Sequence, residues 1–270
     1  MLDLGTALKR RELVVNLAVR TLKVRYKNSA LGFLWTLINP LLMMLIYYVF
    51  IGIVAKIKVD IRIMLTGVIF WQFVVMCTGD AAGAVAGHAN LVKKVYFPRV
   101  LMPFSMCLAN FVNYLLSLVV LLVLIVVISM TRSSADVWLD LSWIWLLPVV
   151  LVLQFALVFG IALIVSALNV YFKDIEHITS VVLMALFFMS PIIYPLKLVR
   201  PETGTSTLAR WYMMNPLASL VTLVRRAFLG TGQPWPLEWT FVPSLALSLV
   251  VLVFGLWLFS RLEPHFADQL

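Results

Sequence analysis

The chain has 270 residues, of which 63% are hydrophobic and only 12% carry a charge. Water-soluble domains have about 25% charged residues, so this composition excludes an ordinary soluble enzyme or binding module. The formal net charge of +9 predicts contact with an anionic partner. Because much of the basic charge stands beside apolar runs, we expect that partner to be membrane lipid and not nucleic acid.

Six long apolar runs divide the sequence, and at about 1.5 Å rise per residue each is long enough to cross a hydrocarbon core of about 30 Å. Lipid offers the backbone no water partner, so the runs are expected to be helices. The fold class is therefore all-α, a single polytopic membrane domain over residues 1–270. The predicted spans are 33–55, 63–87, 101–130, 143–168, 178–196 and 240–260.

Residues 9–27 precede the first span and have a helical period, with mostly basic side chains on one face and mostly apolar side chains on the other. This pattern predicts an amphipathic helix in the membrane interface. A basic anchor that only fixes topology and a working interface element both remain open. Pro40 stands early in the span that follows, where a kink or a broken first turn is expected.

The distribution of basic residues predicts the orientation. Twelve fall in the connections on the N-terminal side of the membrane and nine on the other side. The positive-inside rule therefore places the N-terminus, and with six spans the C-terminus, in the cytoplasm. The connection 197–239 carries five of the nine, and long connections obey the rule less strictly.

The second span combines small residues with one acid. Gly79, Gly83 and Gly87 stand at four-residue spacing and leave one helix face nearly bare, which predicts close packing of another helix. Asp80 is an ionisable group inside an apolar run and is a functional-site hypothesis for that reason. Its place near the cytoplasmic end leaves hydration by water as the alternative.

Two short cytoplasmic connections carry charge. Residues 90–99 are basic and include bulky apolar groups, which favours a docking surface; anchoring of Tyr96 and Phe97 at the lipid headgroups is the alternative. Residues 169–177 are compact and charged, and they either dock the same partner or form a solvated turn.

Prolines and glycines predict the course of the chain after the fourth span. Pro191 and Pro195 cannot both stand in an uninterrupted helix, so the fifth span bends or stops there. Asn215 and Pro216 predict a helix start, and Gly230 predicts its end. A helix over 216–229 is too short to span a membrane and suits a surface or re-entrant position on the outer side.

Chemical motifs are otherwise scarce. Cys77 and Cys107 both fall in apolar runs, as small buried hydrophobes do, and not in a disulfide or metal pattern. The sequence has no Gly-Lys dipeptide and hence no P-loop for a nucleotide phosphate. The three histidines have no ligand-like spacing. A transport role without catalysis in this chain is expected.

Several strings in chain order resemble the ABC-2 type permeases that export lipid-linked polysaccharides, the O-antigen and teichoic acid exporters. The strings stand at 30–41, 70–73, 90–99, 166–174, 190–195, 215–217 and 266–268. The resemblance implies a subunit of the bacterial cytoplasmic membrane that pairs with a second copy of itself and with two copies of a separate ABC ATPase. The ATPase would bind ATP and Mg²⁺, with no cofactor in this chain. The substrate implied is a polyprenyl-linked glycan.

The resemblance also implies roles for particular residues. The ATPase-coupling candidates are Lys93, Lys94, Tyr96, Phe97 and Arg99, followed by Lys173, Asp174 and Glu176. Aromatic side chains line the channel of such exporters, and pyranose rings have apolar faces that stack on aromatic rings. The channel candidates are Trp35, Tyr47, Tyr48, Phe70, Trp71, Phe73, Phe187, Phe188 and Tyr194. The candidates for the pyrophosphate of the lipid carrier are Arg20, Arg25 and Lys27, with ordinary anionic lipid as the alternative ligand.

Other functions stay open beside this one. An ABC-2 exporter of a small molecule such as a drug or haem would share the fold, and the sugar-export strings favour the polysaccharide. A membrane enzyme acting on lipid-linked sugars would need catalytic acids at the inner face, where Asp80, Asp174 and Glu176 form no recognisable pair. A proton-coupled carrier would need buried carboxylates in several spans, and the sequence offers Asp80 alone.

Overall fold

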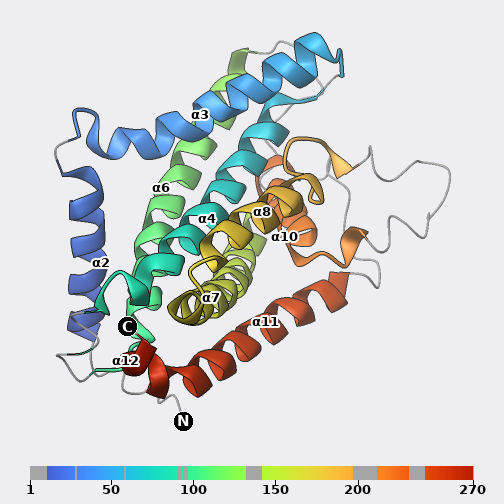
Figure 1. Cartoon of the computed structure of the whole chain (residues 1–270). Coiled ribbons are helices and arrows are strands. Elements are labelled where there is room, and N and C mark those ends of the chain that lie inside the picture. Colours follow the sequence, from blue (N-terminus) through green and yellow to red (C-terminus); the bar gives the residue numbers. More distant parts are fainter. Residues whose placement is uncertain are drawn as a thin grey trace.

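A computed structural model describes residues 11–27, 29–57, 59–89, 93, 97–131, 142–196, 212–230 and 241–269. All regular elements in these ranges are helices, and Figure 1 shows them gathered in one bundle. The prediction of an all-α polytopic membrane protein is confirmed. Five helical segments in this part of the chain are long and apolar enough to cross a membrane: Trp35–Val54, Ile61–Ala86, Leu101–Met130, Ile144–Tyr171 and Val242–Gln269.

The individual helices follow the local sequence. After α2 (Arg11–Tyr26), the 3-10 turn η1 (Gly32–Leu34) leads into α3 (Trp35–Tyr47). Helix α3 continues through Pro40. It is followed directly by the π-helical segment η2 (Tyr48–Val54). Asp60 then caps α4 by accepting the Arg62 backbone N–H at 2.9 Å. The remaining long helices are α4 (Ile61–Ala86), α6 (Leu101–Thr131), α7 (Leu147–Tyr171), which follows the 3-10 turn η3 (Ile144–Leu146), and α11 (Phe241–Leu262).

The predicted fifth span differs from the others. Helix α8 (Ile175–Phe188) has 14 residues, about 21 Å at 1.5 Å per residue, and is therefore shorter than a hydrocarbon core. It ends before Pro191, and no α-helix continues through the segment 189–196. Proline lacks the N–H that would continue the ladder, so the chain turns here as its two prolines predicted.

Helix α10 (Pro216–Leu229) coincides with the predicted short helix. The Asn215 side chain accepts the Leu217 N–H at 3.0 Å, and Gly230 ends the helix with φ of 66°. Twelve of its residues are buried, so it enters the bundle and does not lie on the surface. The chain ends in the 3-10 turn η6 (Glu263–His265) and the short helix α12 (Phe266–Gln269).

Helix α7 forms the centre of the bundle and packs against α4, α6, α8, α10 and α11. Its closest approach is to α11, where a Cβ on Gly160 would lie 2.7 Å from the Cα of Leu252. The first span is the opposite case. Only 6% of its most apolar window is buried, against 67% for α4, so α3 lies at the edge of the bundle.

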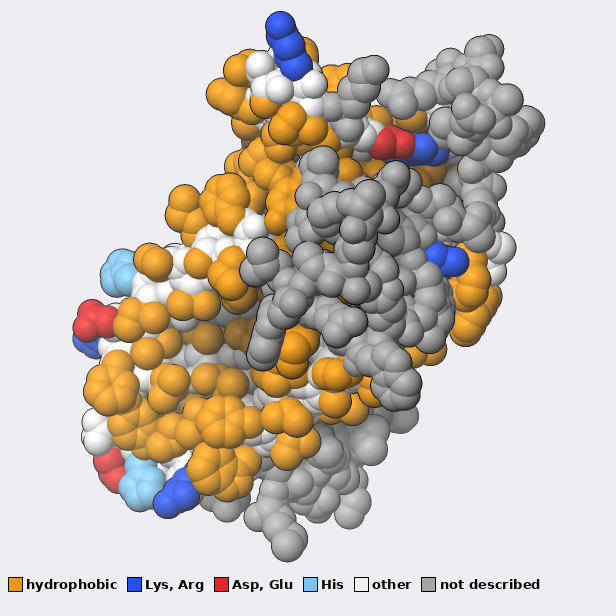
Figure 2. Space-filling model, turned by 90° about the vertical axis from the view of Figure 1, so that its right-hand side faces the viewer, with side chains coloured by type: hydrophobic (Ala, Val, Ile, Leu, Met, Phe, Trp, Pro, Cys, Tyr) orange, Lys and Arg blue, Asp and Glu red, His pale blue; other side chains and the backbone are white. Residues whose placement is uncertain are grey.

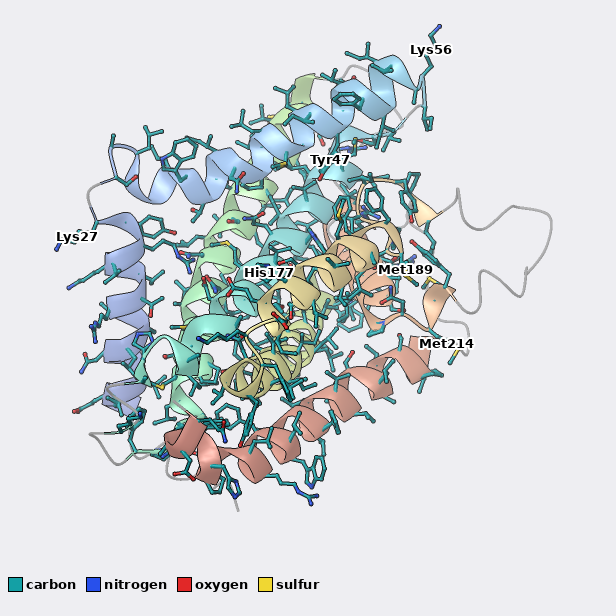
Figure 3. All side chains as sticks on the ribbon, viewed as in Figure 1. Lys27, Tyr47, Lys56, His177, Met189 and Met214 are labelled. Atoms are coloured by element: carbon teal, nitrogen blue, oxygen red, sulfur yellow. The ribbon has the colours of Figure 1, made fainter. Side chains whose placement is uncertain are left out.

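Helix α2 packs against α6, and the start of α2 and the short helix α12 lie near the same end of the bundle (Figure 1). In α2, Val14 and Ala18 are buried, whereas Asn16 and Arg20 are exposed together with Val15 and Val19. The exposed side of α2 is therefore both polar and apolar, and its place in the membrane interface stays a prediction. Lys27 and Lys56 stand near opposite ends of the first span (Figure 3), which fits a helix whose two ends lie in polar headgroup regions. We call this end of the molecule the α2 end.

The outer surface between the ends is apolar. Hydrophobic side chains cover much of the described part of the face in Figure 2, with charged and histidine side chains at its margins. On α11, large apolar groups such as Val250, Val253 and Trp257 are exposed. A surface of this kind is suited to contact with lipid tails, and the chain is a multi-pass membrane protein.

Candidate functional site

A pocket of about 310 Å³ lies between α4 and α8. Its α4 wall contributes an indole ring and a glycine, and its α8 wall contributes two hydroxyls and a carboxylate. Such a mixture of aromatic, hydroxyl and acidic groups can bind a hydroxyl-rich ligand with apolar faces. The lining residues are Trp71, Val75, Gly79, Ala82, Glu176, Thr179, Ser180, Leu183 and Met184.

Missing side chains on α4 create this pocket. A Cβ at Gly79 or at Gly83 would meet no heavy atom within 4 Å. The close helix contact that the glycine spacing predicted is therefore not made at these two positions by any described part of the chain. A close approach occurs instead at Gly67, where a Cβ would lie only 1.9 Å from the carbonyl oxygen of Ile192 in the turn after α8.

An aromatic cluster adjoins the pocket and unites four of the predicted channel residues. The Phe187 ring centroid lies 5.6 Å from that of Tyr47, 5.6 Å from that of Trp71 and 5.3 Å from that of Phe188. Tyr47 lies on the side of α3 that faces α4 (Figure 3), and the π-helical segment η2 begins directly after it. Segments of this kind are frequent at functional sites. The cluster connects α3, α4 and α8.

The other channel candidates separate into buried and exposed groups. Phe70 and Phe73 are buried in the core, and Phe73 stacks on Tyr114 with centroids 4.8 Å apart. Both side chains therefore pack inside this one copy, and a role in the channel stays a prediction for them. Because α4 is apolar on most sides, hydrophobic periodicity could not indicate which of its faces is open. Trp35 is exposed, and Tyr48 is half-buried.

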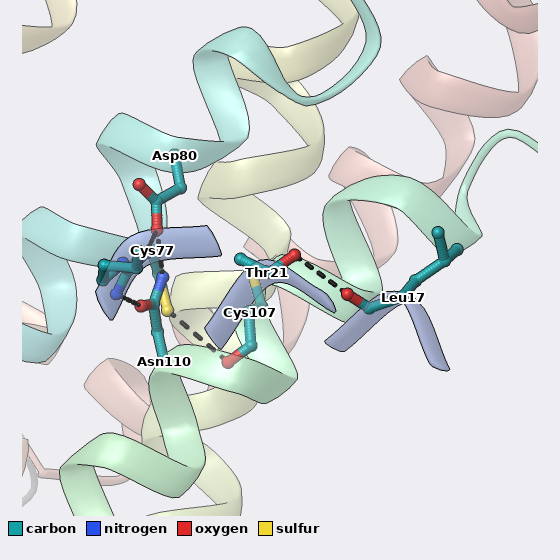
Figure 4. Close-up of polar contacts among 7 residues, drawn as sticks. Leu17, Thr21, Cys77, Asp80, Cys107 and Asn110 are labelled. Atoms are coloured by element: carbon teal, nitrogen blue, oxygen red, sulfur yellow. Dashed lines mark hydrogen bonds and ion pairs between the residues drawn. The ribbon is translucent and has the colours of Figure 1, made fainter. Parts of the chain in front are cut away.

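Asp80 belongs to a polar network that joins three helices. Arg25 of α2 donates to the Asp80 carboxylate and to Asn110 Oδ1, the latter at 2.6 Å, while Asn110 Nδ2 of α6 donates to Asp80 Oδ2 at 2.7 Å. Figure 4 shows Asp80 and Asn110 next to Cys77. Cys77 and Cys107 are buried free thiols, as predicted. The acid in the second span is therefore neutralised by Arg25 of α2.

The phosphate candidates on α2 differ in availability. Arg20 and Lys27 are exposed, so both can reach an anionic headgroup. Arg25 is occupied by Asp80 and Asn110. The sequence placed these three residues in one class, whereas the structure gives Arg25 a tethering role.

The coupling candidates between α4 and α6 also differ. Lys93 is exposed, Phe97 is buried, and Arg99 bonds to Glu263. Lys94 and Tyr96 lie outside the described residues. In the second connection, Lys173, Asp174 and Glu176 are all exposed, and Glu176 also lines the pocket.

Arg225 of α10 is a central residue that is not among the site residues predicted from the sequence. It is 1% exposed and donates to the backbone carbonyls of Ile63, Ile192 and Tyr194 at 2.7 to 3.2 Å. These contacts tie α10 to the start of α4 and to the turn after α8. The only signal in the sequence was an arginine pair in a short, otherwise mostly apolar helix.

Tyr194 and Tyr212 extend this arrangement beyond α8. Their hydroxyls lie 2.9 Å apart, and Tyr194 also donates to the Phe188 carbonyl at 2.9 Å. Burial raises the pKa of Tyr212, and the hydrogen bond with Tyr194 raises that pKa further, so the hydroxyl stays neutral. Tyr194, a channel candidate, therefore closes the turn that ends α8. In the described ranges, no group of three or more His, Cys, Asp and Glu residues could hold a metal ion.

Comparison with known proteins decides the family. The sequence model described as "ABC-2 type transporter" matches residues 12–229. The chain belongs to the ABC-2 type transporter family. It is 32% identical over 264 residues to the O-antigen export system permease protein RfbA of Klebsiella pneumoniae, with 96% of this chain and 95% of the relative covered. The RfbA protein of Myxococcus xanthus is 32% identical over 266 residues, with 96% of each chain covered.

A more distant relative is the polysialic acid transport protein KpsM of Escherichia coli. It is 25% identical over 255 residues, and 92% of each chain is covered. The resemblance inferred from the sequence strings is confirmed at the level of the family. The family match runs from α2 to the end of α10, so the pocket and its flanking helices lie within the shared region.

Proposed function

We propose that this chain is the membrane permease subunit of an ATP-driven exporter that moves a lipid-linked polysaccharide across the bacterial cytoplasmic membrane. The observation that carries the proposal is the similarity along 96% of the chain to proteins that serve O-antigen export. The relative named for polysialic acid transport supports a sugar polymer as cargo. O-antigen or a similar glycan is the substrate class favoured.

The pocket between α4 and α8 supports a sugar ligand. Trp71 offers an aromatic face, and Thr179 offers a hydroxyl that both donates and accepts hydrogen bonds. The Ser180 hydroxyl donates to the Glu176 carbonyl at 3.0 Å and can accept from a ligand. Pyranose rings have apolar faces and equatorial hydroxyls, so they match such a lining. The α4 wall of the pocket is open at Gly79, where a Cβ would meet no heavy atom within 4 Å.

A second copy of the chain is part of the proposal. The first span is barely covered by its own chain, and α8 exposes Val181, Met184 and Phe188. These apolar groups lie next to the polar lining of the pocket, so two copies meeting there would enclose a passage between them. The assembly would contain two permeases and two ATPase subunits.

ATP and Mg²⁺ are assigned to the separate ATPase chain, because a P-loop needs a Gly-Lys pair and this sequence has none. The α2 end would face the cytoplasm, with both termini on that side. The exposed groups Lys93, Lys173 and Asp174 at this end are the contact candidates, together with Lys94 and Tyr96 of the same connection.

Deletion of the gene in its native host tests the function. Loss of the surface glycan together with accumulation of the polyprenyl-linked glycan inside the cell supports polysaccharide export. Complementation with Trp71→Ala should restore much less surface glycan than the parent, at an equal amount of permease in the membrane. Trp257→Ala, a change at a more exposed tryptophan of α11, should restore it. An unchanged surface glycan with retention of a drug or haem would contradict the proposal and favour a small-molecule exporter.

A further inference from the structure

At the α2 end of the molecule, the beginning of α6 and the end of α11 are joined by two hydrogen bonds between the same pair of residues. The backbone N–H of Arg99, just before α6, donates to Glu263 Oε1 at 2.8 Å. The Arg99 guanidinium donates in turn to the backbone carbonyl of Glu263, just after α11. The Glu263 side chain therefore caps the N-terminus of α6, and the Arg99 side chain caps the C-terminus of α11. The two residues are 164 positions apart in the sequence.

The charges of this pair have the favourable sign at both helix ends. A carboxylate stands at the N-terminus of α6, where the helix dipole is positive, and a guanidinium stands at the C-terminus of α11, where it is negative. The last carbonyls of a helix have no partner within it. Here the Leu262 carbonyl accepts the Tyr171 hydroxyl at 3.3 Å, so α7 contributes the second cap of α11.

Aromatic packing holds the C-terminal turn in the same place. Phe266 of α12 is fully buried. Its ring centroid lies 5.3 Å from that of Phe259 and 6.3 Å from that of Tyr171. Figure 1 shows α12 close to the beginning of α6. The ends of α7 and α11 and the beginning of α6 are thereby joined through Arg99, Glu263 and Tyr171, which we call the C-terminal clamp.

The clamp changes the role expected for Arg99. Both its backbone N–H and its side chain are engaged within the chain, whereas Lys93 of the same connection is exposed. We propose that Arg99, Glu263 and Tyr171 are positioning residues, which make α6, α7 and α11 move together when an ATPase displaces the connection between α4 and α6. This inference rests on the proposed function, because it concerns how ATP hydrolysis would be coupled to export.

Side-chain chemistry defines a graded set of variants. Glu263→Ala removes the acceptor for the Arg99 N–H, while Glu263→Gln keeps an acceptor oxygen at the same position. Arg99→Ala removes the cap on α11, and Tyr171→Phe removes only a hydroxyl and keeps the ring against Phe266. His265→Ala is the control, because His265 is exposed in the same turn.

The test uses the complete complex of permease and ATPase in proteoliposomes. The probe is the polyprenyl-linked glycan extracted from a host strain that lacks this gene, and the quantity compared is glycan translocated per ATP hydrolysed. Arg99→Ala and Glu263→Ala should lower this ratio by about tenfold, the size of a typical coupling between sites, while ATP hydrolysis stays within about twofold of the parent. Glu263→Gln and His265→Ala should retain the parent ratio.

Some results would overturn the inference. An unchanged ratio in the alanine variants, or hydrolysis and export that fall in parallel with the amount of assembled complex, would make the clamp a purely structural brace. Should the alanine variants fail to assemble, Tyr171→Phe decides, with a ratio lowered by about threefold expected and an unchanged ratio contradicting the clamp. A parent complex that moves no glycan with ATP contradicts the proposed function itself, and the inference falls with it.

Discussion

Arg25 of α2 and Asp80 of α4 form an ion pair that is closed by Asn110 of α6. The pair joins residues 55 positions apart and, with Asn110, links α2 to α4 and α6. A carboxylate at membrane depth is costly unless it is paired. The pair therefore explains both why Asp80 is tolerated in the second span and why α2 stays against the bundle.

Removal of Arg25 or of Asp80 should lower the stability of the protein, and the effects of the two changes should not be additive. Arg25→Ala and Asp80→Ala should each lower the apparent Tm in detergent, and the double variant should lose less than the sum of the two. The coupling expected for a partly exposed, contacting pair is about 1 kcal/mol. Arg20→Ala, at an exposed residue of the same helix, should leave Tm unchanged. Strictly additive losses would show that the two side chains act independently.

The open face of α4 at Gly79 leads to a second prediction. Gly79→Ala should be accepted without a clash and should stabilise the helix by roughly 0.5–1 kcal/mol, because glycine is a poor helix former. Gly79→Leu should fill the pocket and reduce export while the protein accumulates normally in the membrane. Surface glycan and membrane-inserted protein are measured together.

Gly160→Leu is the contrasting variant. Its side chain would collide with α11 at Leu252, so the protein itself should fail to accumulate. If Gly79→Leu exported glycan like the parent, the pocket would not be part of the substrate path.

The two classes of aromatic residue on α4 and α8 should respond differently to truncation. Phe73 is buried and stacked, so Phe73→Ala should destabilise the protein by about 3–5 kcal/mol through a cavity. Phe188 is exposed beside Phe187, so Phe188→Ala should lower export with little change in Tm. Thermal unfolding and surface glycan separate the effects, and a Phe188 variant with reduced Tm and normal export would reverse the assignment.

Arg225 should be irreplaceable by lysine. The planar guanidinium bonds several carbonyls at once, and an ammonium group cannot reproduce that fork. Arg225→Lys should cost on the order of 3 kcal/mol, because buried carbonyls lose charged donors. Arg226→Lys is the matched control, since Arg226 lies 4.5 Å over the Trp143 ring and a lysine keeps that cation–π contact. Equal Tm values for the two variants would contradict the bridging role of Arg225.

Local chemistry made parts of the fold predictable. Asn215, Pro216 and Gly230 act within a few positions of the helix that they bound, and α10 begins and ends where they predicted. Pro191 likewise stops α8. The long apolar runs predicted the spanning helices, because hydrophobicity and length alone determine whether a helix can cross a membrane.

Long-range contacts could not be read in this way. Nothing near Arg225 in the sequence indicates that it reaches the carbonyls of Ile63 and Ile192, and nothing near Arg99 indicates Glu263. In a helix as apolar as α4, periodicity does not distinguish Phe73, which is buried, from Trp71, which lines the pocket. Those choices depend on which helices pack together, and therefore on the whole fold.

The most direct test of the account is reconstitution of the chain with its co-purifying partner. Mild-detergent purification from the native host should yield an ABC ATPase at one copy per permease, and proteoliposomes of this complex should move polyprenyl-linked glycan across the membrane only when ATP and Mg²⁺ are supplied. A chain that purifies without an ATPase even after gentle crosslinking, or that moves glycan equally well without ATP, would contradict the role of an ATP-driven export permease.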